Sequence, residues 1–506
     1  MSSENDNVIH GFSKRLALER EIEALAEAST AIELERRARA LAGHGEQIVP
    51  VLIRHLGTDN AQIRGGLGLV ARYLDRDLIV PALHRAAADP HLPGDARLTA
   101  VMILERYLDV EVEPALAQTL PDASEVARQS AEEALALAEK DPYTFYEYAE
   151  QLLAEPPEIV NAVLDVLVTI DDPRMAQLLM TIAGYAPEHV RQRLVQRIGT
   201  IRHPLALQAL RTLAHLVPAS QRADVQRQVR KLQMAGVTSG PAPVLRGLWS
   251  PMDAFGNHFL WFIQSQEDGQ SVNLLMLLLH DTLGVQQAGA QADVPRHDAP
   301  TAAEVGHLHR LKVADISYHF HLVEMVPALA LTLVDDAVQA SIDAELPLPA
   351  ALVTFGHWLW GSGEPDGAAS WPDLPPPAES AQGTEFVDLF GHPAFATWLW
   401  TLPESEHSVL DEKPESVQIP GSPVHQRIAQ ALVADEAAST LARRCRSQAL
   451  WLTLTGESRL AALALAAAHA FEHKVVDHPF VQTLAWRTLV AAVQEDAVPP
   501  DLRLLS

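Results

Sequence analysis

The first half of the chain alternates short apolar helices with polar turns. Between residues 46 and 235, apolar residues recur three or four positions apart, as at Leu67, Val70 and Leu74, which is the spacing of one helix face. Prolines interrupt this pattern at Pro93, Pro121, Pro156, Pro187 and Pro218. The pattern predicts about six helix pairs over 46–236. Because one short pair cannot bury its apolar face alone, we expect successive pairs to stack and share a core.

A highly charged segment precedes these pairs. Residues Ser13–Ala42 combine helical spacing of apolar positions with many charges. We expect one long helix within residues 1–45, which caps the open end of the stack.

Most of the turns carry an acidic residue followed by an arginine. The pairs are Asp59 and Arg64, Asp95 and Arg97, Asp122 and Arg128, and Glu188 and Arg191. The acid can accept hydrogen bonds from the free N–H groups at the start of the second helix. The arginine is predicted to pair with the acid of a neighbouring turn.

With these turns, residues 46–235 resemble the HEAT-repeat family, close to its short phycobilisome-lyase-like type. The fourth copy departs from the pattern, with Asn161 in place of the arginine, and in the sixth the spacing slips. The resemblance implies an armadillo-like α-solenoid that offers a surface for protein–protein interaction. It does not imply lyase activity, because these repeats contain no thiol.

The second half has a different pattern. A helix-breaking linker at 238–243 predicts a domain boundary near 236–243, and all nine tryptophans follow it. Apolar runs separated by turn signals then predict a small antiparallel α+β module over 244–325, with three or four strands between 244 and 290. A helix over 271–280 remains an alternative, because leucine and methionine favour helices.

Residues 326–506 are predicted to be mainly helical. Helices are expected over 328–345, 428–445, 447–454, 457–473 and 480–494. Proline-, serine- and glycine-rich stretches near 361–384 and 403–423 predict mobile loops. The motif Phe-x-x-Trp-Leu-Trp occurs at 355–360 and again at 395–400, and it indicates either two core-facing segments or a paired aromatic binding surface. The overall prediction is a mainly α protein.

Composition removes several classes of function. The 506 residues carry a net charge of −27, which disfavours wholesale binding of nucleic acid. Cys445, the one cysteine, excludes a disulfide framework and thiolate-rich metal sites; flanked by arginines in a helix, it is interpreted as a spectator. No apolar run approaches about 18 residues, and the first residues lack a secretory signal, so we expect a cytoplasmic protein without a membrane span.

Catalytic motifs are weak. No nucleophile elbow, phosphate-binding loop or established metal-binding spacing occurs, and we predict neither a cofactor nor a metal site. The best metal candidates are His319, His321 and Glu324. On a strand His319 and His321 would share one face, whereas on a helix they would diverge.

A basic patch is the clearest electrostatic feature. Residues 186–235 hold nine basic and two acidic residues, whereas 241–430 hold six basic and 24 acidic ones. The predicted partner-binding residues are Arg191, Arg193, Arg197, Arg202, Arg222 and Arg227. Either the acidic 241–430 region docks on the patch, or an external acidic protein does; nucleic acid is the least favoured partner.

These observations favour a noncatalytic scaffold or adaptor that binds a protein through the solenoid surface. One alternative is an enzyme with a metal-dependent site in 244–325. The other is a nucleic-acid-binding repeat protein that uses the 186–235 patch.

Overall fold

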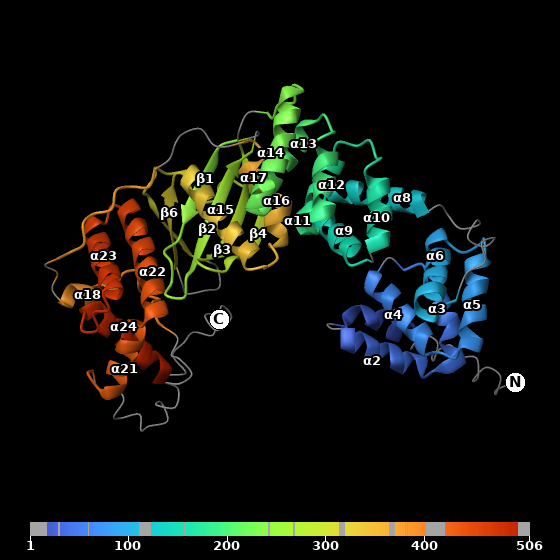
Figure 1. Ribbon diagram of the computed structural model, residues 1–506, viewed down its shortest axis with the longest axis horizontal. Coiled ribbons are helices and arrows are strands. Elements are labelled where there is room, and N and C mark those ends of the chain that lie inside the picture. The colour runs from blue at the N-terminus through green and yellow to red at the C-terminus, as the bar shows by residue number, and fades with distance from the viewer. Residues whose placement is uncertain are drawn as a thin grey trace. The chain divides into compact units, whose positions relative to one another are not determined.

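The chain forms two compact units in a computed structural model (Figure 1). The structure describes residues 18–493 except 29–30, 59, 111–122, 156, 241–242, 267–268, 313–318, 364–369, 380, 382 and 401–419. The first unit comprises Met1–Lys140 and Glu150–Asp171, and the second comprises Asp141–Ala149 and Asp172–Ser506. The compact units therefore divide near residues 140–172, whereas the sequence predicted a boundary near 236–243.

The first unit is helical. Its elements are η1 (Ala24–Glu27), α2 (Ala31–Ala42), η2 (Gly45–Gln47), α3 (Val49–Arg54), α4 (Ala61–Tyr73), α5 (Arg76–Ala88), α6 (Gly94–Met102), η3 (Ile103–Tyr107), α8 (Ala123–Ala138) and α10 (Pro157–Leu167); α9 (Thr144–Leu153) is shared between the units. One apolar core contains Leu25, Leu52, Leu67 and Leu104, all fully buried.

The predicted single helix over Ser13–Ala42 is wrong. The chain tightens into the 3-10 turn η1 and becomes extended at Ala28, before α2 begins at Ala31. This break lets Leu25 enter the core, where it packs close to Gly66 of α4. Residues 13–17 lie outside the described part of the chain.

Two arginines of the turns donate to backbone carbonyls, one of them at the end of a helix and the other in the turn before α4. Arg97 donates from Nε to the carbonyl oxygen of Ala87, near the end of α5, over 2.9 Å, and Arg64 donates to Thr58 O over 2.9 Å. The last carbonyls of a helix lack intrahelical donors and carry its negative dipole, so they attract a guanidinium. The sequence predicted an acid of a neighbouring turn as the partner of each arginine, and this stays a prediction. Asp59 and Asp122 lie outside the described residues.

The second unit combines helices with one sheet. Its helices are α11 (Met175–Tyr185), α12 (Glu188–Ile198), α13 (Pro204–Leu216), α14 (Ala219–Met234), α15 (Pro327–Asp343), α16 (Ala350–Phe355), α17 (His357–Trp360), α18 (Gly383–Leu389), α21 (Pro423–Leu432), α22 (Asp435–Leu454), α23 (Ser458–Glu472) and α24 (Pro479–Val493). Its strands are β1 (Leu245–Trp249), β2 (Asn257–Ser265), β3 (Ser271–His280), β4 (Gly284–Pro295), β5 (Leu308–Lys312) and β6 (His319–Met325).

The sheet is antiparallel throughout, in the order β4-β3-β2-β1-β6-β5. The sequence predicted three or four strands between 244 and 290, and β1–β4 confirm this. The sheet gains two further strands because β6 pairs with the free side of β1 and β5 pairs with β6. The leucine-rich segment 271–280 is a strand. Its two sides enter two different cores, Leu275 on one face and Leu274 on the other, which explains a continuous apolar run.

Helices cover one face of the sheet. Helix α15 lies close to β1, where an added Cβ on Gly247 would come within 2.6 Å of the Ala330 Cβ. The opposite face has a smaller core with Leu248, Ile263 and Leu322, against which Phe259 and Trp261 pack half-buried.

Within this unit, helices α11 and α13 contact the segment that runs from α15 to α17. Tyr185 donates its hydroxyl to Leu348 O over 3.2 Å, and His215 Nδ1 lies 2.8 Å from Asp335 Oδ1. The His215 ring also stacks on Trp360 at 4.8 Å. These contacts, between residues on either side of 236–243, place α11 and α13 in one compact unit with the sheet.

The C-terminal helices differ from the prediction in α16, α17 and α18, which were not among the expected helices, and over 423–454. The helix expected over 428–445 breaks at Val433 and Ala434, and α22 then runs without interruption to Leu454. The two Phe-x-x-Trp-Leu-Trp motifs contribute to the core: Trp360 and Trp398 are buried, and Trp398 donates to Met252 O over 2.9 Å. Most of the predicted loop over 403–423 lies outside the described residues. Of the predicted loop over 361–384, the described residues form no helix or strand until α18 begins at Gly383.

Candidate partner-binding surface on helices α12 and α14

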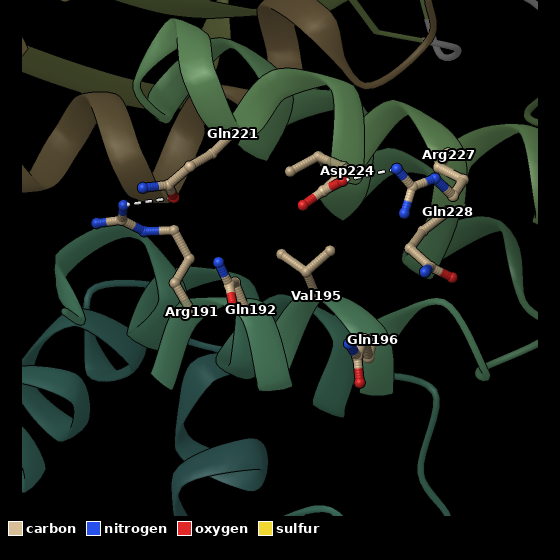
Figure 2. Close-up of a pocket in the computed structure, with 9 residues that line it drawn as sticks. Arg191, Gln192, Val195, Gln196, Gln221, Asp224, Arg227 and Gln228 are labelled. Atoms are coloured by element: carbon tan, nitrogen blue, oxygen red, sulfur yellow. Dashed lines mark hydrogen bonds and ion pairs between the residues drawn. The ribbon is translucent and has the colours of Figure 1, made fainter. Parts of the chain in front are cut away.

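A polar groove runs between α12 and α14 (Figure 2). It is lined by Arg191, Gln192, Val195, Gln196, Gln221, Asp224, Val225, Arg227 and Gln228. The space inside it is about 80 Å³. Because small-molecule sites typically enclose about 300–1,000 Å³, this groove suits individual side chains of a partner better than a cofactor.

Both helices expose polar side chains, because each has few apolar residues and its buried residues are all apolar. Of the sixteen residues of α14, only Val225 and Leu232 are buried. Val195 of α12 and Val225 of α14 are buried and line the groove. Glutamines and arginines line it from both helices (Figure 2). A helix that is polar on nearly all sides is typical of a solvent-facing or partner-contacting position.

Arg191 holds the groove together. Its Nε donates to Ala183 O and its Nη2 to Ala186 O, each over 2.8 Å, so it closes the end of α11. Its Nη1 donates to Gln221 Oε1 of α14 over 2.9 Å (Figure 2). Burial lowers the pKa of the Arg191 guanidinium, although Glu188 opposes that effect. Arg191 therefore acts mainly as an internal brace.

The other predicted arginines have different surroundings. Arg227 lies at the groove, is exposed, and pairs with Asp224 at 2.9 Å. Arg222 is half-buried, and its Nε and Nη2 make no hydrogen bond within the described part of the chain. Arg197 donates to Thr200 Oγ1 over 2.9 Å, Arg193 is half-buried, and Arg202 is exposed before α13. The structure thus brings Arg191 and Arg227 to one groove, and the other four do not line it.

The glutamines of the groove were not predicted. Gln192 and Gln196 lie one turn apart on α12, and Gln221 and Gln228 lie on the facing side of α14. Gln228 packs against Gly199, where any larger residue would overlap its side chain. A glutamine repeat at i and i+4 beside an arginine is the sequence signal that could have indicated this surface.

The predicted metal candidates do not come together. His321 shares its sheet face with Val323 and Met325, whereas Glu324 points to the opposite face, because side chains alternate along β6. Glu324 accepts two hydrogen bonds from Arg246, at 2.7 Å each, and lies 2.9 Å from His309 Nε2. The side chain of His319 is outside the described part of the structure. Among the residues that are described, no group of three or more His, Cys, Asp or Glu is placed to hold a metal ion.

A second polar cluster is buried where the sheet meets α22. Asp281 accepts hydrogen bonds from Arg444 Nε and Nη2 over 2.9 Å and from Arg443 over 2.8 Å. Burial raises the pKa of Asp281, but the two arginines outweigh it and leave this pKa below its usual value. Nearby, burial lowers the pKa of His258 to about 4. This cluster ties the β2–β3 end of the sheet to α22.

No family model matches the chain, and no curated protein matches it. Within the described residues, no helix is long and apolar enough to cross a membrane.

Proposed function

We propose that the chain is a noncatalytic scaffold or adaptor, and that it binds a protein partner through α12 and α14. The proposal includes a HEAT-type solenoid arrangement of the helices in 46–236, with these two helices on its binding side. The observation that carries it is the α12–α14 groove, which is polar, solvent-facing and too small for a cofactor.

The chemistry of the groove favours an acidic, extended partner segment. Arg227 is exposed and offers a fork of donors, although Asp224 occupies part of it. The side-chain amides of Gln192 and Gln196 can both donate to and accept from a backbone. A carboxylate of the partner would compete with Asp224 for Arg227 while the glutamines bind its main chain.

Docking of the acidic 241–430 region on the basic patch stays a prediction. The described contacts between the helices before residue 241 and that region include Tyr185 of α11 and His215 of α13, together with Arg211, one of the nine basic residues of the patch. These contacts leave the α12–α14 groove available to an external partner.

The test is capture of a partner by the full chain, followed by binding measurements with variants. R227E should weaken binding of the captured protein by about tenfold or more, because it places a carboxylate opposite an acidic segment. R85E is the matched control: it makes the same charge change at an exposed arginine of α5. Equal affinities of R227E and R85E would overturn the assignment of the groove.

A further inference from the structure

The two edges of the sheet differ in their protection. Edge strands expose unpaired backbone groups, and proteins block unwanted pairing there with charges, prolines or bulges. Edge strand β5 carries Arg310 and Lys312. Edge strand β4 has no charged residue from Gly284 to Ala292, and Asp293 is its first charge. The β5 edge therefore carries positive charges that disfavour pairing with another strand, whereas the β4 edge is uncharged along most of its length.

The middle of β4 is available for pairing. At its start, the Val285 N–H already donates to Ser341 Oγ of α15 over 2.8 Å. From Gln287 to Gln291 the strand pairs in regular register with Leu278–Leu274 of β3. In the described part of the chain, this segment has no backbone hydrogen bond to any segment other than β3. Gln287 and Gln291 are exposed, and the residues between them are half-buried.

This segment is self-complementary. Residues 287–291 read Gln-Ala-Gly-Ala-Gln, which is symmetric about Gly289. In an antiparallel pairing with the twofold axis at Gly289, Gln287 lies opposite Gln291 of the partner subunit, and alanine lies opposite alanine. Side-chain amides directly opposite each other can exchange hydrogen bonds across the seam. On the helix-covered face, Ala288 and Ala290 pack against the main core of the unit, so the two glutamines are the side chains that would meet a second copy on the open face.

We propose that β4 is a homodimer interface, at which two copies of the chain pair edge to edge about Gly289. An isologous contact of this kind closes on itself, so it yields a dimer and not a filament. The net charge of −27 on each copy opposes association, whereas the seam itself is neutral. Salt screens the repulsion, so dimerisation strengthens as the ionic strength rises. A dimer also presents two α12–α14 grooves to one partner, which raises avidity for a partner with two binding segments.

The experiment is sedimentation equilibrium of the full chain over a range of concentrations and salt. Wild type should reach twice the monomer mass of 55.2 kDa. The double variant Q287K/Q291K places lysines opposite each other at the seam and should raise the dimer dissociation constant by about tenfold or more. The control Q47K/Q151K adds the same charge at exposed glutamines elsewhere and should leave that constant unchanged.

A rescue separates pairing from misfolding. An equimolar mixture of Q287K/Q291K and Q287E/Q291E should form heterodimers, because lysine then faces glutamate across the seam. Two results would overturn the proposal: a wild type that stays monomeric at all concentrations and salts, or a dimer that Q287K/Q291K does not weaken. Failure of the mixture to associate would also count against edge pairing.

Discussion

Replacing Arg191 by methionine tests whether this arginine is an internal brace. The change keeps most of the side-chain length but removes donors to Ala183 O, Ala186 O and Gln221 Oε1. A hydrogen bond to a charged group contributes about 1.5–3 kcal/mol. The site is only half-buried, so water replaces part of this loss. We therefore expect R191M to lower the free energy of unfolding of the second unit by about 2–4 kcal/mol.

Tryptophan fluorescence in urea is the appropriate assay. All nine tryptophans follow residue 248, so fluorescence reports on the second unit, which also contains Arg191. The midpoint shift multiplied by the slope of the transition gives the change in free energy, provided that the slope is unchanged. R227M is the matched control. It removes an exposed arginine with one ion pair, which contributes at most about 1 kcal/mol.

A shift for R191M no larger than that for R227M would refute this reasoning. It would mean that the helix-end carbonyls are satisfied equally well by water, and Arg191 would return to the set of residues free to bind a partner.

Three further predictions concern the buried groups around α22. D281N leaves the buried Arg444 without its charge partner and should lower the free energy of unfolding by about 3–5 kcal/mol. Because the folded pKa of Asp281 is depressed, wild type should lose the contribution of this ion pair as the pH falls below about 4, whereas the variant should show no such loss. H258L should flatten the pH dependence of stability between 6.5 and about 4. Over this range the histidine of the unfolded chain binds a proton whereas buried His258 does not, so wild type should lose up to about 3 kcal/mol as the pH falls; parallel urea titrations of wild type and H258L would check it. Cys445 is fully buried and its thiol pKa is raised well above the usual value, so it should react with a thiol reagent only after unfolding; rapid labelling of the native protein would contradict this.

Local patterning predicted most helices of the chain. The spacing of apolar residues and the terminating prolines gave α15, α23 and α24 to within a residue or two. The break inside the predicted helix at 13–42 was not visible, because Ala24–Glu27 has ordinary helical residues. That break serves a tertiary need, the burial of Leu25 against Gly66. The residues of the candidate groove were predicted only in part. The clustering of arginines indicated Arg191 and Arg227, but it did not indicate the glutamines beside them.

The sequence by itself determined the alternation of helices, the position of the sheet segment and the uneven distribution of charge. These features depend on residues close together along the chain, where spacing fixes which side chains share a face. Only the tertiary structure decided that 271–280 is a strand, since two cores on opposite faces override the helical preference of leucine. It also decided that Glu324 turns away from His321 and that Arg191 braces helix ends. Those outcomes depend on strand pairing and packing between distant segments, which no local pattern encodes.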